Sequence, residues 1–400
     1  MSIPNLETIQ SYMREQRIDG WLVHDFRGSD PVLARLLPGE GGRRWTTRRV
    51  ALFVPARGEP RLLAHAIDEA QFAAAPVKVE RYVTWRELHA WLAGVIAGAG
   101  ASARIAMDYS PGAALPAIAY ADAGTVELVR GLGAEVVSAA NVIQAAIARW
   151  DDAARANHER ASRVVTEAKD AAFEMIRAAH ASGERVTECG VQRLILDRFA
   201  AAGLETADAP IVAVNAHSGD PHYGPSPERD TPIAPGDWVL IDLWARVPGE
   251  ENVFSDITWC GYAGRTAPGR HQEVYDTVRR ARDAALERAV RAWKDGEPVQ
   301  GWELDDAARG VIVDAGYGEF IRHRTGHSLS PGPAVHGLGM NLDNLETHDT
   351  RIMLPGIGFT IEPGIYTPEF GVRLEINVFV DPSAGPVVTS CVQDEVVLLG

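Results

Sequence analysis

Short apolar runs alternate with amphipathic stretches over about the first 150 residues of the chain. Runs of strand-forming residues predict strands at Trp21–His24, Val50–Val54, Arg61–Ala64 and Arg104–Met107. Arg57-Gly58 lies between the second and third of these runs and predicts a hairpin. Apolar positions at helical spacing predict helices at Ile67–Ala75 and Glu87–Ile96. We therefore expect residues 1–150 to form a small α/β domain, and we find no glycine-rich phosphate-binding motif in it.

A different pattern begins at Asp151. Apolar residues recur with a period close to 3.6 from Asp151 to Ala181, which predicts one long amphipathic helix. Asp151 or Asp152 can cap the first turn of this helix, and Gly183 can end it. We therefore place a domain boundary here and expect a second domain over residues 151–400.

The second domain contains two segments that resemble each other. Pro235-Gly236 is followed by strand-forming residues and then Asp242, and Pro355-Gly356 is followed by a similar run and then Glu362. Each copy carries a further acid, Asp256 or Glu375, and follows a helical run that lies between two glycines. A repeat of roughly 110–120 residues is too long for a solenoid. It predicts an α+β fold with internal pseudo-two-fold duplication, in which two half-domains face each other across a shared sheet.

The four acids of the repeat need partners, because a buried carboxylate is costly unless it is paired or binds a metal. Alternation along Val372–Asn377 places Arg373, Glu375 and Asn377 on one face of the predicted strand. Leu374 and Ile376 then pack behind that face. An ion pair would satisfy any single acid of the set. Cations explain all four acids together, so we expect a metalloenzyme.

Histidines gather in the same part of the chain. His327 lies between the two acid pairs, in a glycine-flanked segment whose backbone can approach a metal closely. One imidazole with four carboxylates suits two divalent ions, Mn²⁺ first, with Co²⁺ or Zn²⁺ as alternatives. Two bridged ions would hold a water, lower its pKa and stabilise the oxyanion of an attacked carbonyl, which indicates hydrolysis. We leave His217 and His24 open, and expect structural roles for histidines without acidic neighbours: His65, His89, His158, His180 and His271.

Composition removes several other classes of function. The formal net charge of −15 is unfavourable for a nucleic-acid binder, which needs a basic surface. No stretch is long and apolar enough to suggest a membrane span, and residues 1–20 do not resemble a secretory signal. The three cysteines are scattered and fit reduced thiols better than disulfides. We therefore expect a cytoplasmic protein.

The motifs around these residues resemble those of the pita-bread metallopeptidases. The five residues that match the family's metal ligands stand in Ile-Asp-Leu, Ser-Asp-Ile-Thr, Thr-Gly-His, Ile-Glu-Pro-Gly and Arg-Leu-Glu: Asp242, Asp256, His327, Glu362 and Glu375. The family includes methionine aminopeptidase, aminopeptidase P, prolidase and the metal-free creatinase. An α/β domain of about 150 residues before the catalytic half is typical of the prolidase, aminopeptidase P and creatinase branch. The resemblance therefore implies a pita-bread catalytic domain, over residues 151–400, preceded by a creatinase-type N-terminal domain.

The resemblance also implies roles for these residues. Asp242 would bind one metal, and Asp256 and Glu375 would bridge both metals. His327 and Glu362 would complete the coordination of the second metal. Glu362 or Glu375 would carry a proton from the bridging water to the leaving nitrogen. His222 and His336 match histidines that contact the reacting peptide bond. His323 and Arg373 match residues at the substrate carboxylate and around the ligands.

We expect hydrolysis of the Xaa-Pro bond of dipeptides, as by prolidase, with action on longer peptides, as by aminopeptidase P, as the alternative. Val247–Asn252 and Ser330–Pro333 lengthen the intervals between ligands compared with the family and leave this peptide-length preference open. A creatinase-like enzyme would lack the ligands, and so would a non-catalytic relative that binds a protein partner. The resemblance also implies a homodimer, with contacts made by the N-terminal domain, which would also border the cleft.

Overall fold

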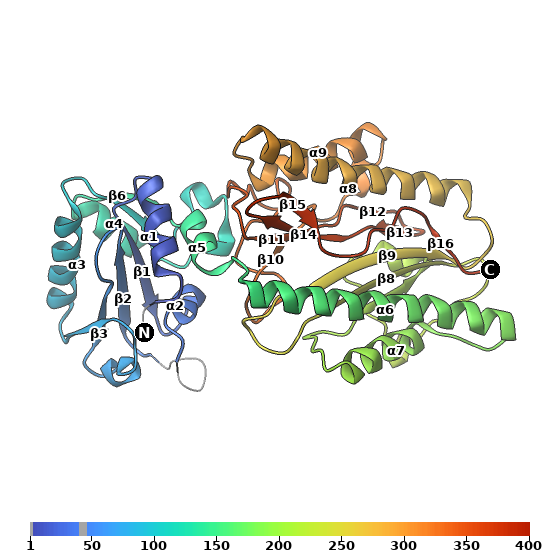
Figure 1. The fold of residues 1–400 in the computed structure, drawn as a ribbon, viewed down its shortest axis with the longest axis horizontal. Helices are drawn as coiled ribbons and strands as arrows, with labels where there is room; N and C mark the ends of the chain where they lie inside the picture. Colours follow the sequence, from blue (N-terminus) through green and yellow to red (C-terminus); the bar gives the residue numbers. More distant parts are fainter. Residues whose placement is uncertain (1–2, 40–45) are drawn as a thin grey trace. The chain divides into compact units, whose positions relative to one another are not determined.

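The computed structural model describes residues 3–39 and 46–400 of the chain. It divides into two compact units, Met1–Ala148 and Arg149–Gly400 (Figure 1). Within the described ranges, no helix has both the length and the hydropathy that crossing a bilayer requires.

The first unit is built on a six-stranded mixed sheet. Its strand order is β4-β3-β2-β1-β5-β6. The strands are β1 (Gly20–Phe26), β2 (Arg49–Pro55), β3 (Arg61–His65), β4 (Lys78–Tyr82), β5 (Arg104–Met107) and β6 (Glu135–Ser138). The strands β1, β2 and β3 pair antiparallel, and the other pairings are parallel. These strands confirm the four predicted ones and the hairpin.

Helices cover both sides of this sheet. They are α1 (Leu6–Glu15), α2 (Pro31–Leu36), α3 (Trp85–Ala99), α4 (Ala123–Gly131) and α5 (Ala140–Ile147). In Figure 1, α3 lies on one side of the strands and α1 and α2 on the other. The helix predicted at Ile67–Ala75 is wrong, because the chain forms only a short 3-10 turn, η1 (Glu69–Phe72). The carboxylate of Asp68 accepts the N–H groups of Thr47 and Arg48 instead of capping a helix, and Pro76 disfavours helical backbone before it.

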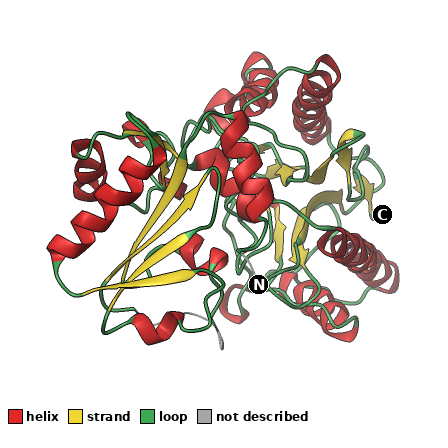
Figure 2. Ribbon diagram, turned by 60° about the vertical axis from the view of Figure 1, so that its left-hand side comes forward, coloured by secondary structure: helices red, strands yellow, loops and turns green. Residues whose placement is uncertain are grey.

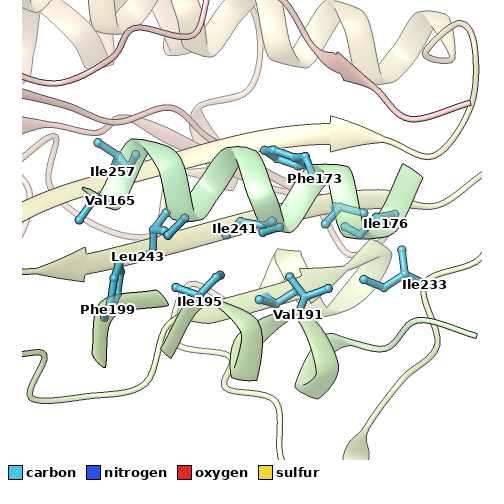
Figure 3. Packing of buried hydrophobic residues seen from close by; sticks show 14 of the residues in the cluster. Val165, Phe173, Ile176, Val191, Ile195, Phe199, Ile233, Ile241, Leu243 and Ile257 are labelled. Atoms are coloured by element: carbon cyan, nitrogen blue, oxygen red, sulfur yellow. The ribbon is translucent and has the colours of Figure 1, made fainter. Parts of the chain in front are cut away.

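The first half of the second unit packs two helices on one sheet. α6 (Asp152–Ser182) begins where the Asp151 carboxylate accepts the N–H of Ala154, and it ends at Gly183 with φ 75°, as predicted. α7 (Glu188–Ala201) follows. The sheet order is β16-β9-β8-β7, formed by β7 (Ile211–Val214), β8 (Trp238–Ala245), β9 (Ser255–Tyr262) and β16 (Val397–Leu398). Figure 3 shows the core between these layers, where Phe173 of α6 and Ile195 of α7 lie near Ile241 of β8.

The second half repeats this plan. It contains α8 (Gly269–Asp295) and α9 (Gly301–Asp314), a sheet of order β10-β11-β14-β15 and a two-stranded ribbon. The strands are β10 (Ser328–Leu329), β11 (Gly358–Ile361), β14 (Ile376–Asp381), β15 (Gly385–Val388), and β12 (Gly364–Tyr366) with β13 (Gly371–Arg373) in the ribbon. Figures 1 and 2 show the strands of this unit between α6 and α7 on one side and α8 and α9 on the other. The unit therefore has the predicted duplicated α+β form.

Two details differ from the prediction. The halves do not share one continuous sheet, because their strands pair into two separate four-stranded sheets. The run Val372–Asn377 is not one strand either, since pairing stops at Leu374 and Glu375 between β13 and β14. There the N–H of Glu375 donates to the carbonyl oxygen of Thr258 in β9, at 3.2 Å. The break thus turns Glu375 toward the other half.

Candidate metal centre

The hairpin of β8 and β9 carries Asp242 and Asp256 on one face. Asp242 lies opposite Thr258 in the antiparallel register, and Asp256 lies opposite Trp244. Directly opposite residues share a face, and successive residues alternate. The other face carries Ile241, which enters the core with α6 and α7 (Figure 3). The alternation therefore separates an apolar core face from an acidic site face.

His327 and Glu362 come from two chain segments of the second half that lie close together. The N–H of His327 donates to the Thr360 hydroxyl at 2.9 Å, and the N–H of Glu362 donates to the Thr325 carbonyl at 2.7 Å. A Cβ added to Gly326 would lie 2.1 Å from the carbonyl oxygen of Thr360. Only glycine permits this approach. Backbone contact therefore fixes where His327 and Glu362 stand.

Asp256, His327 and Glu375 converge on one point. Each offers a ligand atom, and these atoms lie within 4.8 Å of one another. His327 Nε2 lies 3.5 Å from Asp256 Oδ2 and 3.4 Å from Glu362 Oε1. His327 Nδ1 lies 3.1 Å from the Ser328 carbonyl, which can only accept, so Nδ1 carries the proton and Nε2 keeps its lone pair. Nε2 is thereby left as a ligand atom directed at the acids.

The donor set fits divalent cations. Among the described residues, Asp256 Oδ1 and Glu375 Oε1 are buried oxygens without a hydrogen-bond partner. Buried oxygens of this kind are costly unless a cation binds them. Burial raises the pKa of Glu375 well above its usual range, and the charges of Asp256 and Glu362 add to the effect. Two cations would remove this repulsion and occupy the unpartnered oxygens.

Asp242 stands beside this group, held by Arg373. The Arg373 guanidinium donates to Asp242 Oδ2, to the Thr258 hydroxyl at 2.9 Å and to the Tyr366 hydroxyl at 3.1 Å. Burial raises the pKa of Asp242 to about 7, against the opposing effect of Arg373. The Thr258 hydroxyl donates in turn to Glu375 Oε2 at 2.9 Å. Arg373 and Thr258 thus link the acids of the two halves, in the manner of side chains that orient metal ligands.

The remaining predicted histidines lie around this centre. The ring of His336 lies on that of His327, with centroids 4.0 Å apart, and His336 Nδ1 is 3.5 Å from Arg324 Nη2. The neighbouring His327 and burial lower the pKa of His336 to about 3. His323 Nε2 lies 2.6 Å from the Tyr366 hydroxyl. His222 is exposed in a turn, where its N–H donates to Asp220 Oδ1 at 3.0 Å.

Sequence reasoning missed a buried network that supports the segment of His222. The carboxylate of Glu188 accepts from Val214 N at 2.8 Å, His217 Nδ1 at 2.9 Å and the Tyr223 hydroxyl at 2.6 Å. His217 and Tyr223 flank His222 in sequence, and their rings stack 4.2 Å apart. Glu188 therefore anchors both sides of the His222 turn, and His217, left open from sequence, belongs to this anchor.

Sequence reasoning also missed Thr258 and Tyr366. Alternation along Ser-Asp-Ile-Thr places Thr258 on the same face as Asp256, so a signal for it was present. Nothing near Tyr366 in the sequence indicates that it joins His323 to Arg373.

A duplicated α+β unit with buried carboxylates and one imidazole at its centre defines a metal-dependent hydrolase. Residues 156–382 match the profile of Metallopeptidase family M24, and the chain belongs to this family. It is 29% identical over 378 residues to the probable dipeptidase PepE of Mycobacterium tuberculosis (strain H37Rv), covering 90% of this chain and 88% of that protein. It is 34% identical over 166 residues to the Xaa-Pro dipeptidase of Lactobacillus helveticus, covering 41% of this chain and 40% of that protein. The crystal structure of dipeptidase PepE from Mycobacterium ulcerans shares the fold, with a TM-score of 0.67 and 24% identity over 99% of this chain and 97% of that one.

Proposed function

We propose that this metallopeptidase hydrolyses the Xaa-Pro bond of dipeptides with two divalent ions, Mn²⁺ foremost. The observation that carries the proposal is the convergence of Asp256, His327 and Glu375, with two of the carboxylate oxygens buried and unpartnered. The names of the relatives support the substrate class, because they include an Xaa-Pro dipeptidase and a probable dipeptidase.

Five side chains would hold the cations. Asp256 and Glu375 would be shared, since each has one oxygen without a hydrogen-bond partner. His327 and Glu362 would complete the coordination of one ion. Asp242 would bind the other ion, and Arg373 would hold the Asp242 carboxylate in its orientation. The bound ions would supply Lewis acidity, polarising the substrate carbonyl and lowering the pKa of a water.

The chain's own groups would bind the substrate and move the proton. Glu362 or Glu375 would take the proton of the attacking water and pass it to the proline nitrogen. His336, whose ring lies on His327, would donate a hydrogen bond to the carbonyl oxygen, with His222 facing the peptide bond from its turn. His323 would lie at the substrate carboxylate, and hydrogen bonds of its Nδ1 with Arg324 O and of its Nε2 with the Tyr366 hydroxyl fix its ring there. Arg373 would orient Asp242 and Tyr366 through the hydrogen bonds that its guanidinium donates to both.

A peptide panel on metal-loaded protein tests the proposal. We expect Mn²⁺-dependent hydrolysis of Ala-Pro that exceeds that of Ala-Pro-Ala, and its loss in Asp256→Asn. Preference for Ala-Pro-Ala would favour the aminopeptidase P alternative. Fewer than one bound ion after Mn²⁺ or Co²⁺ loading would contradict the metal centre and favour a binding protein.

We also propose that the protein is a cytoplasmic homodimer whose N-terminal domain makes the dimer contact and borders the cleft. The scattered free cysteines are compatible with a reducing compartment. Light scattering of the full chain and of variants in the first unit would test the dimer.

A further inference from the structure

Asp256 differs from the other acids of the metal centre in how its carboxylate is held. Each of the other three accepts a hydrogen bond from a side chain that is not a proposed ligand: Asp242 from Arg373, Glu375 from Thr258, and Glu362 from Thr360. Asp256 Oδ1 has no partner among the described residues, and Asp256 Oδ2 lies 3.5 Å from Nε2 of His327, itself a proposed ligand. Because an aspartate side chain is short, the position of this carboxylate depends on how the backbone of Asp256 is held.

The side chain of Asn377 holds that backbone. The N–H of Asp256 donates to Asn377 Oδ1 at 3.0 Å, and Asn377 Nδ2 donates to the carbonyl oxygen of Asp256. The Ser255 hydroxyl also donates to Asn377 Oδ1, at 3.3 Å. Asn377 is fully buried in β14, in the opposite half of the unit. Its carboxamide therefore pairs with the donor and the acceptor of one residue of β9, as a neighbouring strand would.

The internal repeat gives this contact a counterpart. The offset of 119 residues between Asp256 and Glu375 (375 − 256) also relates Thr258 to Asn377 (377 − 258). Thr258 holds Glu375, because its carbonyl oxygen accepts the N–H of Glu375 and its hydroxyl donates to the Glu375 carboxylate. Each of the two acids proposed to bridge the ions is thus held by a residue of the opposite half, two positions beyond its own counterpart.

A second carboxamide makes the same pair of hydrogen bonds farther along β9. Gln393 Oε1 accepts the N–H of Cys260 at 2.8 Å, and Gln393 Nε2 donates to the carbonyl oxygen of Cys260 at 2.6 Å. Gln393 is also buried. The two contacts differ in one respect, because Asn377 holds a proposed metal ligand and Gln393 does not.

We propose that Asn377 is a positioning residue of the metal centre, whose carboxamide fixes the backbone of Asp256 and thereby directs a carboxylate shared by both ions. This inference rests on the metal centre of the proposed function. Without Asn377, the N–H and carbonyl of Asp256 would be buried and unpaired. The strand would shift to pair them elsewhere, and the carboxylate of Asp256 would move with it.

Metal binding tests this role independently of activity. In Asn377→Leu we expect Mn²⁺ affinity, measured by calorimetry, to fall about 10–100-fold, as when other partners that orient ligands are lost. The visible absorption spectrum of the Co²⁺-loaded protein should change as well, because it reports the geometry of the ligands. Asn377→Ser is a smaller perturbation, whose side chain is too short to reach both groups of Asp256, and it should weaken Mn²⁺ binding in the same direction. For Ala-Pro, kcat should fall more than KM rises, since the substrate contacts remain.

Gln393→Leu is the matched control. It removes the same two kinds of hydrogen bond from the same strand, but at Cys260. We expect it to lower the melting temperature about as much as Asn377→Leu does. Its Mn²⁺ affinity and Co²⁺ spectrum should match those of the wild-type protein.

The outcomes separate this inference from the proposed function. Mn²⁺ affinity within threefold of wild type in both Asn377→Leu and Asn377→Ser, with an unchanged Co²⁺ spectrum, would overturn the positioning role. Equal losses of affinity in Asn377→Leu and Gln393→Leu would also overturn it, because any break at this strand would then act alike. Wild-type protein that binds Mn²⁺ but hydrolyses no Xaa-Pro dipeptide would refute the proposed function, while the comparison of affinities still decides the role of Asn377.

Discussion

Gly326→Ala tests whether backbone contact sets the position of His327, the proposed metal-binding histidine. The new methyl group would lie 2.1 Å from the carbonyl oxygen of Thr360 and 2.9 Å from its carbonyl carbon. An ordinary van der Waals contact needs about 3.5 Å, so the segments must separate by about 1.4 Å. The flanking hydrogen bond from Thr360 N to His327 O, 2.9 Å long, resists that movement. His327 would therefore be displaced from Asp256 and Glu375.

A displacement of this size lowers kcat/KM by about 10²-fold. We expect that loss for Gly326→Ala on Ala-Pro, with Mn²⁺ affinity by calorimetry reduced as well. Gly310→Ala is the matched control, because a Cβ at Gly310 in α9 would meet nothing within 4 Å. In a helix this change should stabilise the protein by about 0.5–1 kcal/mol and leave kinetics unchanged. A folded Gly326→Ala enzyme with full metal content and kcat/KM within threefold of wild type would refute the reasoning.

Three further predictions concern groups around the centre. Thr258→Val removes the hydroxyl that donates to Glu375 and should weaken Mn²⁺ binding by about 10–100-fold, whereas Thr258→Ser should not; equal affinities in calorimetry would contradict this. Glu188→Gln should lower kcat about 10-fold with little change in KM, because His222 loses its anchor but the substrate contacts remain; a change in KM alone would contradict this role. Burial lowers the pKa of His158 from 6.5 to about 4, so below pH 6.5 the unfolded chain binds a proton that the folded protein does not. The unfolding free energy should therefore fall by about 3 kcal/mol between pH 6.5 and 4 through this residue. Melting temperatures of metal-loaded His158→Gln should be less sensitive to pH over this range than those of wild type, and parallel curves would count against the burial effect.

The short segments that carry the proposed ligands could be predicted from the sequence, because turn and strand preferences of neighbouring residues determine their structure. Pro-Gly turns and strand-forming runs place Asp242 in β8 and Glu362 at the end of β11, and Gly326 marks a close backbone approach. The helix α8 was not predicted although its apolar positions have helical spacing. The buried side of its second half consists largely of alanines, which give a weak apolar signal: Ala281, Ala285, Ala289 and Ala292.

The contacts between the halves could not be predicted from the sequence. The link from Arg373 through Thr258 to Glu375 joins positions 115 and 117 residues apart. Strand alternation gives the face of a side chain but not the neighbour it meets across a sheet boundary. For the same reason, the break at Glu375 could not be seen, since it depends on the carbonyl of Thr258.

The division of the ligands between two halves has a consequence for biosynthesis. As the chain leaves the ribosome, Asp242 and Asp256 emerge first, and Arg373, which pairs with Asp242, follows 131 residues later. The early chain thus presents two of the five proposed ligands and lacks His327, so it binds a transition metal poorly. Loading with metal must wait for the second half to fold against the first, so cation uptake reports that the whole catalytic unit has formed. Two separately produced halves would accordingly acquire metal only after they are mixed.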